Sequence, residues 1–288
     1  MKIIKYLFEF VLISIFFIIF KIIGFRNASN LGEILGKKFG PLFRSNNKIK
    51  KNLQDSNIGN SEDERKIIIN DMWGNYGRIF SEYMFIKNFR HDTKFSKKIM
   101  IENQEELEKI KLQKKPVIFI SGHFNNFELM AMQIEKSGID LATIYRPLNN
   151  PYLNKTMEEI RIKYICKKQI KKGRAGTREI IKNLNKGTSI ALMIDQRVRE
   201  GVKVPFFKHL ATTTTIPAQL IKKYNCDLVP IYIERDKLNH FKMYVSEPIK
   251  INKTKNISEI TTHLNKILEK MIRKNIDQWI WTHDRWKD

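Results

Sequence analysis

Residues 119–132, FISGHFNNFELMAM, place a histidine and a carboxylate five positions apart between two apolar runs. His123 follows Gly122, and Glu128 lies inside the second run. A neutral imidazole that donates one ring N–H to a carboxylate can take a proton from a hydroxyl with its other nitrogen, and the carboxylate then stabilises the imidazolium. The pair indicates general-base catalysis without a serine nucleophile. The alternative is that His123 ends a strand and Glu128 pairs with a lysine.

Strands and helices that alternate along the chain would have to position this pair. Short apolar runs with β-branched residues predict strands, and more polar stretches between them predict helices. The predicted strands are 116–121, 141–145, 189–194 and 228–233, and the helical stretches lie near 126–137, 152–165, 176–186 and 216–225. This alternation predicts an α/β sheet flanked by helices.

His123 is then expected at the carboxyl end of a strand, where open α/β sheets commonly bind ligands. On one continuous helix, residues five apart point ~140° apart, so His123 and Glu128 meet only if the chain bends between them. Gly122 allows such a bend, and either Asn125 or Asn126 is a suitable cap for a helix that carries Glu128 in its first turn.

Two charged or polar stretches are interpreted as loops. Residues 46–66 are polar around DSNIGNSEDER, and residues 167–174 read KKQIKKGR. The second stretch is either a solvated loop or a contact for anionic headgroups or an acidic protein.

Residues 3–25 are the most apolar segment, and their interior from Phe10 to Phe20 is uncharged. As a helix the segment would be ~35 Å long, enough to cross a bilayer core of ~30 Å. We expect a membrane-anchor helix over residues 1–25 and one catalytic domain over residues 26–288. A cleaved signal peptide and a buried core helix are the alternatives. Basic residues after the segment predict a cytoplasmic domain by the positive-inside rule.

The composition indicates an anionic partner, because the chain has 53 Lys and Arg residues but only 30 Asp and Glu residues, a net charge of +23. A membrane-attached nucleic-acid-binding protein would explain this charge. The sequence nevertheless lacks a helix-turn-helix signature, zinc-finger spacing or an RNP-like strand, so we expect no nucleic acid partner.

Cys166 and Cys226 belong to no CxxC pair or zinc-ligand spacing, and His123 and Glu128 have no visible third ligand. We therefore expect no metal site.

Three further charged residues are candidates for substrate binding. Arg146 follows a predicted strand, and Arg161 lies on the next helix, so both side chains are expected to point toward the same opening of the predicted site. Arginine binds phosphate through a planar fork and stays charged, although each side chain alone could be a solvated surface arginine. Asp195 ends the strand at 189–194 as His123 ends the strand at 116–121. It is expected to position an arginine or the acceptor, or to cap a turn.

Six blocks of the sequence, in order, resemble the bacterial late acyltransferases of lipid A biosynthesis, the lauroyl and myristoyl transferase family. GHFNNFE is similar to that family's G-H-F-x-N-W-E block, with Phe127 where tryptophan is usual. The other blocks are YRPLNNP at 145–151, GTREIIKNLNKG at 176–187, DQRVREGVKVPFF at 195–207, ATTTTIPAQL at 211–220 and QWIWTHDRWK at 278–287. The resemblance runs from the N-terminal segment to the last residues.

This resemblance implies a glycerol-phosphate-acyltransferase-like sheet and an O-acyltransferase that depends on acyl carrier protein. The donor would be the carrier protein thioester, and the acceptor a hydroxyl on an acyl chain of a phosphorylated lipid A precursor. His123 would be the base and Glu128 its orienting partner, without an acyl-enzyme or a cofactor. Arg146 and Arg161 match recurrent arginines of the family, and Asp195 matches its aspartate. Backbone N–H groups near the start of the helix after Asn126 would stabilise the oxyanion.

The resemblance further implies an inner-membrane protein of lipopolysaccharide biosynthesis, with its catalytic domain on the cytoplasmic side. The closest alternative is an acyltransferase that acts on another glycolipid or on glycerol phosphate. Relatives that act on glycerol phosphate usually carry aspartate where this chain has Glu128. The sequence leaves open the acyl chain length, the acceptor hydroxyl, and whether residues 3–25 span the membrane or lie in it.

Overall fold

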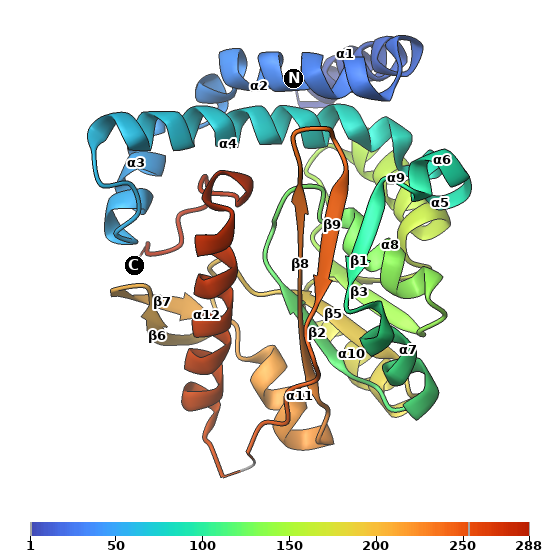
Figure 1. Ribbon diagram of the computed structural model, residues 1–288, viewed down its shortest axis with the longest axis vertical. Helices are drawn as coiled ribbons and strands as arrows, with labels where there is room; N and C mark the ends of the chain where they lie inside the picture. The colour runs from blue at the N-terminus through green and yellow to red at the C-terminus, as the bar shows by residue number, and fades with distance from the viewer. Residues whose placement is uncertain (1, 253, 288) are drawn as a thin grey trace.

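A seven-stranded sheet forms the centre of the molecule in the computed structural model, which describes residues 2–252 and 254–287 (Figure 1). The strand order is β1-β9-β8-β2-β5-β3-β4, and a separate hairpin is formed by β6 and β7. The strands are β1 (Ile99–Glu102), β2 (Ile118–Ser121), β3 (Leu141–Tyr145), β4 (Lys168–Lys171), β5 (Ser189–Met193), β6 (Val202–Phe206), β7 (His209–Thr213), β8 (Leu228–Arg235) and β9 (Phe241–Val245).

Helices cover both faces of the sheet, and one helical layer closes its carboxyl edge. The α-helices are α1 (Lys2–Ile23), α2 (Phe25–Phe43), α3 (Asn46–Asp55), α4 (Glu62–Glu82), α5 (Ile86–His91), α6 (Thr93–Ser96), α7 (Gln104–Gln113), α8 (Glu128–Lys136), α9 (Pro151–Ile160), α10 (Arg174–Asn185), α11 (Ile216–Tyr224) and α12 (Ile257–Lys274). Three short helical turns are η1 (Tyr83–Phe85), η2 (Arg161–Ile165) and η3 (Ile276–Gln278). The predicted α/β architecture is confirmed, and the apolar N-terminal segment is a helix.

The strands from β8 to β4 run parallel, so their carboxyl ends share one edge of the sheet. All four predicted strands are present as β2, β3, β5 and β8. Successive residues of β2 are buried on opposite faces: Ile118 and Ile120 belong to the core that includes α12 residues, and Phe119 belongs to the core that includes α8 residues. Burial on both faces explains why these strands read as continuous apolar runs.

Both stretches interpreted as loops contain regular structure: only residues 56–61 of the first lie between α3 and α4, and β4 occupies residues 168–171 of the second. The loop interpretation was therefore wrong for 46–55, 62–66 and 168–171. Residues 46–55 form α3, whose buried residues are Ile49, Asn52 and Leu53. Residues 168–171 form the edge strand β4, in which Ile170 is fully buried. Each element buries only one or two apolar side chains, and the polar residues around them hide its period.

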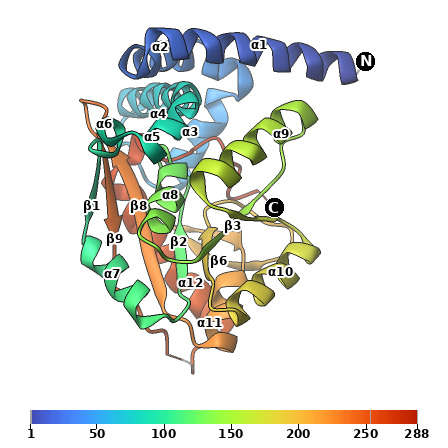
Figure 2. The ribbon, with the colours of Figure 1, turned by 90° about the vertical axis from the view of Figure 1, so that its right-hand side faces the viewer.

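The layer at the carboxyl edge is built from α1, α2 and α4, with α1 and α2 outermost (Figures 1 and 2). Gly32, Gly36 and Gly40 repeat every four residues along α2 and face Trp73 and Gly77 on α4. A Cβ atom on Gly77 would lie 1.8 Å from the carbonyl oxygen of Gly32. The two helices therefore touch backbone to backbone.

Gly77→Ala is accordingly expected to destabilise the fold by about 1–3 kcal/mol, the usual cost of overpacking, because backbone has to move. Gly74→Ala is the matched control on the same helix, since its Cβ would meet only the flexible side chains of Lys37 and Glu33. Alanine favours helix over glycine by about 1 kcal/mol, so this variant should unfold at or near the wild-type temperature. Thermal unfolding of both variants measures the difference, and equal melting temperatures would contradict the proposed close contact.

Candidate active site

The side chains of His123 and Asp195 meet at the carboxyl edge of the sheet. In the parallel ladder between β2 and β5, Ser121 lies opposite Met193, so both side chains belong to residues two positions beyond the same rung. His123 Nδ1 lies 2.8 Å from Asp195 Oδ1, and the His123 backbone N–H donates to Asp195 Oδ2 at 2.8 Å. The carboxylate thus holds the histidine by its ring and by its backbone.

Asp195 is almost fully buried and accepts a third hydrogen bond, from Trp279 Nε1 at 3.0 Å. Burial by itself raises the pKa of this carboxyl group. The charge of His123 and the hydrogen bonds from His123 and Trp279 outweigh burial, so the pKa of Asp195 is lowered overall. Asp195 is therefore an ionised acceptor.

Because Asp195 accepts at Nδ1, the His123 ring carries its proton there and keeps a lone pair on Nε2. Nε2 has no hydrogen-bond partner within residues 2–252 and 254–287. Burial lowers the pKa of the imidazole, but the charge and hydrogen bond of Asp195, helped by the charge of Glu128, outweigh it and raise the pKa of His123 overall. Phe127 packs edge-on against the ring at 4.8 Å between centroids. This arrangement suits a proton acceptor.

Glu128 does not form the expected hydrogen bond with His123 in the part of the chain that the structure describes. It is the first residue of α8, and its Oε1 accepts from Arg161 Nε at 2.8 Å and also from Arg161 Nη2. The physical reason is that α8 starts at Glu128 and turns this side chain toward η2, while Asp195 already occupies the Nδ1 side of the ring. Glu128 reaches His123 only as a nearby charge.

The two candidate arginines have different surroundings. Arg161 begins η2, is largely buried, and lies over the Tyr145 ring at 5.7 Å. Burial lowers the pKa of its guanidinium, but Glu128 outweighs burial and raises it overall. Arg146 is exposed just after β3, and the described residues offer it no hydrogen bond or ion pair. Asp195 contacts neither arginine, contrary to the expectation that it would position one of them.

The asparagines after His123 do not cap α8 as expected. The N-cap residue is Phe127, without a side-chain cap. The backbone N–H of Asn126 donates to Asn125 Oδ1 at 2.6 Å, and that of Phe127 donates to the Asn125 carbonyl at 3.0 Å. The N–H of Glu128, by contrast, has no hydrogen-bond partner among the described residues.

Sequence reasoning missed Trp279 and Gln278 as neighbours of the site. Trp279 is buried, and its indole N–H donates a hydrogen bond to Asp195. Phe124 and Trp279 also form an isolated antiparallel bridge. The QWIWTHDRWK block was the only signal for this contact, because 84 residues separate Asp195 from Trp279 along the chain.

Among the described residues, no group of three or more His, Cys, Asp or Glu side chains is placed to hold a metal ion. The site consists instead of a histidine with a buried carboxylate on one nitrogen and an open second nitrogen. It can accept a proton from a substrate hydroxyl or water that reaches Nε2.

The whole chain, residues 1–288, matches the family model described as bacterial lipid A biosynthesis acyltransferase. The lipid A biosynthesis palmitoleoyltransferase of Escherichia coli (strain K12) is 24% identical over 262 residues, which cover 89% of this chain and 84% of that protein. A lipid A biosynthesis acyltransferase of Haemophilus influenzae is 26% identical over 233 residues, covering 78% and 72%. The lipid A biosynthesis lauroyltransferase of Escherichia coli (strain K12) is 27% identical over 205 residues, covering 69% and 65%.

Proposed function

Because the chain belongs to the bacterial lipid A biosynthesis acyltransferases, we propose that it transfers a fatty acyl chain from an acyl carrier protein thioester to a lipid A precursor. The family makes the chain an acyltransferase of lipid A biosynthesis. The donor, the acceptor hydroxyl on an existing acyl chain, and the catalytic roles below are our proposal. The contact that carries it is the His123–Asp195 pair with an open Nε2.

In the proposed reaction, His123 Nε2 takes the proton of the acceptor hydroxyl while the hydroxyl oxygen forms a bond to the thioester carbonyl carbon. Asp195 holds the ring in the required tautomer and stabilises the imidazolium by charge. The tetrahedral intermediate then expels the thiolate as the C–S bond breaks, and the imidazolium returns the proton to the sulfur. The thioester supplies an activated carbonyl, so no cofactor or metal is required.

The developing oxyanion needs hydrogen-bond donors or positive charge close to His123. The N–H of Glu128 is the candidate amide, because the amides of Asn126 and Phe127 already donate locally. Arg161 contributes positive charge beside the site, and its fork is held by Glu128. We propose that the Glu128–Arg161 pair positions this guanidinium, and that Glu128 does not orient the base directly.

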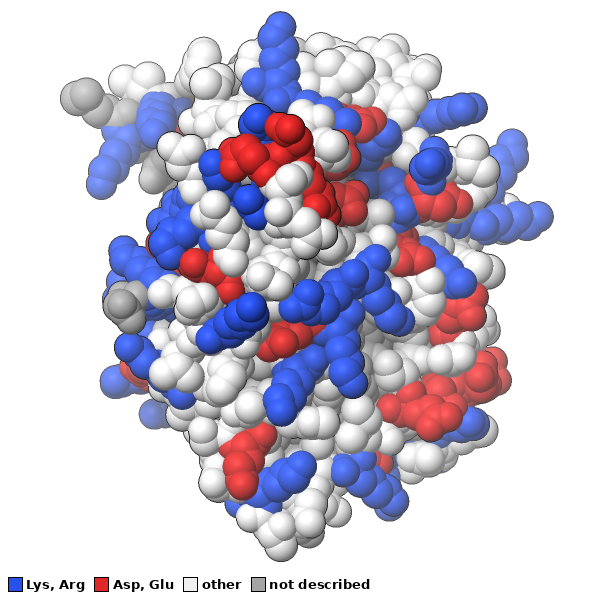
Figure 3. Space-filling view, turned by 60° about the vertical axis from the view of Figure 1, so that its left-hand side comes forward, with Lys and Arg blue, Asp and Glu red and all other residues white. Residues whose placement is uncertain are grey.

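For the phosphate groups of the acceptor, Arg146 is the better candidate of the two arginines. Its side chain is exposed, and no ion pair within the described residues compensates its charge, whereas Arg161 is paired with Glu128. Lys and Arg side chains are also spread over the face shown in Figure 3, with smaller acidic groups among them. A surface of this sign fits a phosphorylated lipid and an acidic carrier protein.

We propose that the protein binds the cytoplasmic face of the inner membrane through α1 and α2. Within residues 2–252 and 254–287, α1 is the helix long and apolar enough to cross a bilayer. Its N-terminal half contacts the start of α9, where Asn150 Nδ2 donates to the Tyr6 carbonyl at 2.8 Å, while Phe20 near its other end is fully buried against Phe80. A helix held along its length by the protein favours an orientation in the membrane plane over a spanning one.

The outward faces of both helices are apolar. The exposed large apolar side chains are Ile3, Ile4, Leu7, Phe8, Val11, Leu12, Ile15, Ile18, Ile19 and Ile22 on α1, and Ile34, Phe39, Leu42 and Phe43 on α2. Lys21 and Arg26, where the two helices meet, can contact anionic headgroups. The combination is typical of an interfacial amphipathic layer.

Replacing both Leu42 and Phe43 by aspartate should weaken binding to anionic vesicles. These side chains are 81% and 84% exposed at the end of α2, so the change adds charge to the proposed membrane face without opening the core. Leu112→Asp is the matched control, because Leu112 is 78% exposed on α7, on the part of the molecule remote from α1 and α2 (Figure 1). Vesicle flotation compares the variants, and equal flotation of both with the wild type would contradict this membrane face.

The proposed function is tested by expressing the chain in a host that lacks its own late acyltransferases and measuring the lipid A by mass spectrometry. We expect lipid A with one additional ester-linked acyl chain. Unchanged lipid A with a well-expressed protein would contradict the proposed acceptor. Acylation of another glycolipid or of glycerol phosphate in the same extract would favour the alternative substrate.

A further inference from the structure

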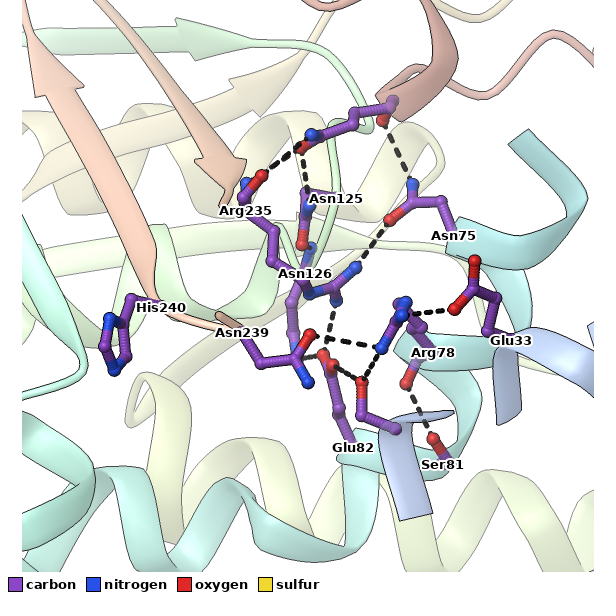
Figure 4. A network of polar contacts seen from close by, with 12 residues as sticks. Glu33, Asn75, Arg78, Ser81, Glu82, Asn125, Asn126, Arg235, Asn239 and His240 are labelled. Atoms are coloured by element: carbon purple, nitrogen blue, oxygen red, sulfur yellow. Dashed lines mark hydrogen bonds and ion pairs between the residues drawn. The ribbon is translucent and has the colours of Figure 1, made fainter. Parts of the chain in front are cut away.

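A buried carboxylate packs against residues 123–126, which we call the catalytic segment, and no sequence motif indicated it. Glu82 is the last residue of α4 and is fully buried. Its Oε2 accepts from Arg235 Nη2 at 2.6 Å and from Asn126 Nδ2 at 3.2 Å, and its Oε1 accepts from Ser29 Oγ at 2.8 Å (Figure 4). One carboxylate thus joins α4 to α2, to the end of β8 and to the segment that follows His123.

Arg235 compensates the charge of Glu82. It is itself buried, donates from Nη1 to Asn75 Oδ1 at 3.0 Å, and lies over the Phe241 ring at 5.2 Å. Burial lowers the pKa of the guanidinium, and Glu82 opposes that effect. A buried ion pair of this kind adds little net stability, but losing one partner is costly because the other charge stays uncompensated.

The same network holds Asn125 through Gln278. The Asn125 backbone N–H donates to the Gln278 carbonyl at 2.8 Å, and Asn125 Nδ2 donates to Gln278 Oε1 at 2.6 Å. Gln278 is fixed in turn by the backbone of Arg235, which donates to Oε1 at 2.8 Å and accepts from Nε2 at 3.0 Å. Asn125 has a φ of 44°, a left-handed conformation that needs such support.

The catalytic segment is therefore held at two points. Asp195 holds His123 at its start, and the network holds Asn125 and Asn126 two and three residues later. Asn126 Oδ1 is buried and has no hydrogen-bond partner in the described part of the chain, so the Asn126 side chain gains only its contact with Glu82. Burying a polar atom without a hydrogen-bond partner costs stability, so the retained contact with Glu82 is the feature of this side chain that needs an explanation.

We propose that Glu82 is a positioning residue for acyl transfer: through Asn126 it fixes the backbone that carries His123, and so it fixes Nε2 relative to the acceptor hydroxyl. This inference rests on the proposed role of His123 as the base. Glu82 touches neither substrate nor reacting atom. Its contribution is alignment, for which displacements of about 1 Å can cost roughly 10²-fold in rate.

Asn126→Ala is the direct test, because it removes the contact to the catalytic segment and leaves the Glu82–Arg235 pair intact. With acyl carrier protein thioesters and purified lipid A precursor, kcat should fall by roughly 10- to 10²-fold, while KM stays within about twofold. Ser29→Ala is the matched control, since it removes another hydrogen bond to the same carboxylate from the α2 side. It should lose similar thermal stability but keep the wild-type kcat.

A second measurement needs no substrate. Nuclear magnetic resonance titration of His123 should show a lower pKa in Asn126→Ala than in the wild type, because a displaced segment weakens the contact with Asp195 that raises this pKa. Ser29→Ala should titrate as the wild type does. An unaltered kcat together with an unaltered His123 pKa in Asn126→Ala would overturn the inference.

Glu82→Gln does not separate alignment from general loss of structure, because it leaves Arg235 without its counter-charge and should lower both activity and thermal stability. Asn126→Ala keeps that pair and is therefore the decisive variant. If His123→Ala is inactive while Asn126→Ala behaves as wild type, the role of Glu82 fails and the proposed function stands.

Discussion

His123→Ala should reduce acyl transfer to near background while leaving a folded protein that still binds the acceptor. The variant removes the proposed base, whose loss typically costs roughly 10²–10⁴-fold, and it opens a small space beside Phe127 rather than in the main core. Initial rates with acyl carrier protein thioesters and lipid A precursor, normalised to folded protein, measure the effect.

The control for this loss is His209→Ala. His209 is exposed on β7, so removing its imidazole changes the histidine content without touching the site, and activity should be unchanged. A His123→Ala protein that retains a tenth or more of wild-type turnover would mean that the acceptor loses its proton by another route.

The second large effect should come from Asp195→Asn, and it should exceed that of Glu128→Gln. Asp195 contacts both the ring and the backbone of His123, whereas Glu128 is bonded to Arg161. An amide at position 195 can donate to Nδ1, which favours the tautomer whose proton sits on Nε2, where it blocks proton acceptance. We expect Asp195→Asn to lower kcat by roughly 10²-fold or more, and Glu128→Gln to have a smaller effect.

The pH dependence of acyl transfer tests the His123–Asp195 pair independently. A base works when it is neutral, so wild-type activity should fall as the pH drops through the pKa of His123, which lies above the ordinary value because the Asp195 charge outweighs burial. In Asp195→Asn that charge is gone, so the acidic limb of the profile should move to lower pH. In Glu128→Gln it should move less. The reverse order of the two variants, in turnover and in pH profile, would restore Glu128 as the orienting partner.

His123 and Asp195 should also behave as one unit. In a protein that already lacks His123, Asp195→Asn removes an orienter with nothing left to orient, so the double variant should be little slower than His123→Ala. If the two losses multiply in well-folded proteins, Asp195 contributes something other than support of the histidine.

The sequence predicted the elements that depend on a local pattern of apolar and polar residues. The strand before His123 and the helix after it follow from apolar runs and their breaks, and the histidine was placed at a strand end correctly. Proximity along the chain favoured Glu128 as the hydrogen-bond partner of His123, whereas the partner in the structure is Asp195. Asp195 becomes its neighbour only through the pairing of β2 with β5, a contact between residues 72 positions apart.

Other parts of the site had no readable signal. Glu82 ends a helix with weak amphipathicity, so a buried acid there looks like an ordinary exposed one. Gln278 and Trp279 were visible only through the family resemblance, because their contacts with Asn125 and Asp195 bring together segments far apart in the chain. Such buried polar contacts depend on the complete packing of several elements.

The glycine contact between α2 and α4 makes the outer layer and the catalytic segment parts of one rigid frame. Helices in backbone contact cannot slide or roll past each other without separating, and α4 ends in the carboxylate that holds Asn126. If α2 rests on the bilayer, His123 then works at a constant height above the lipid surface. For the proposed acceptor, the distance of each hydroxyl group from the membrane surface would then decide which of them reaches His123.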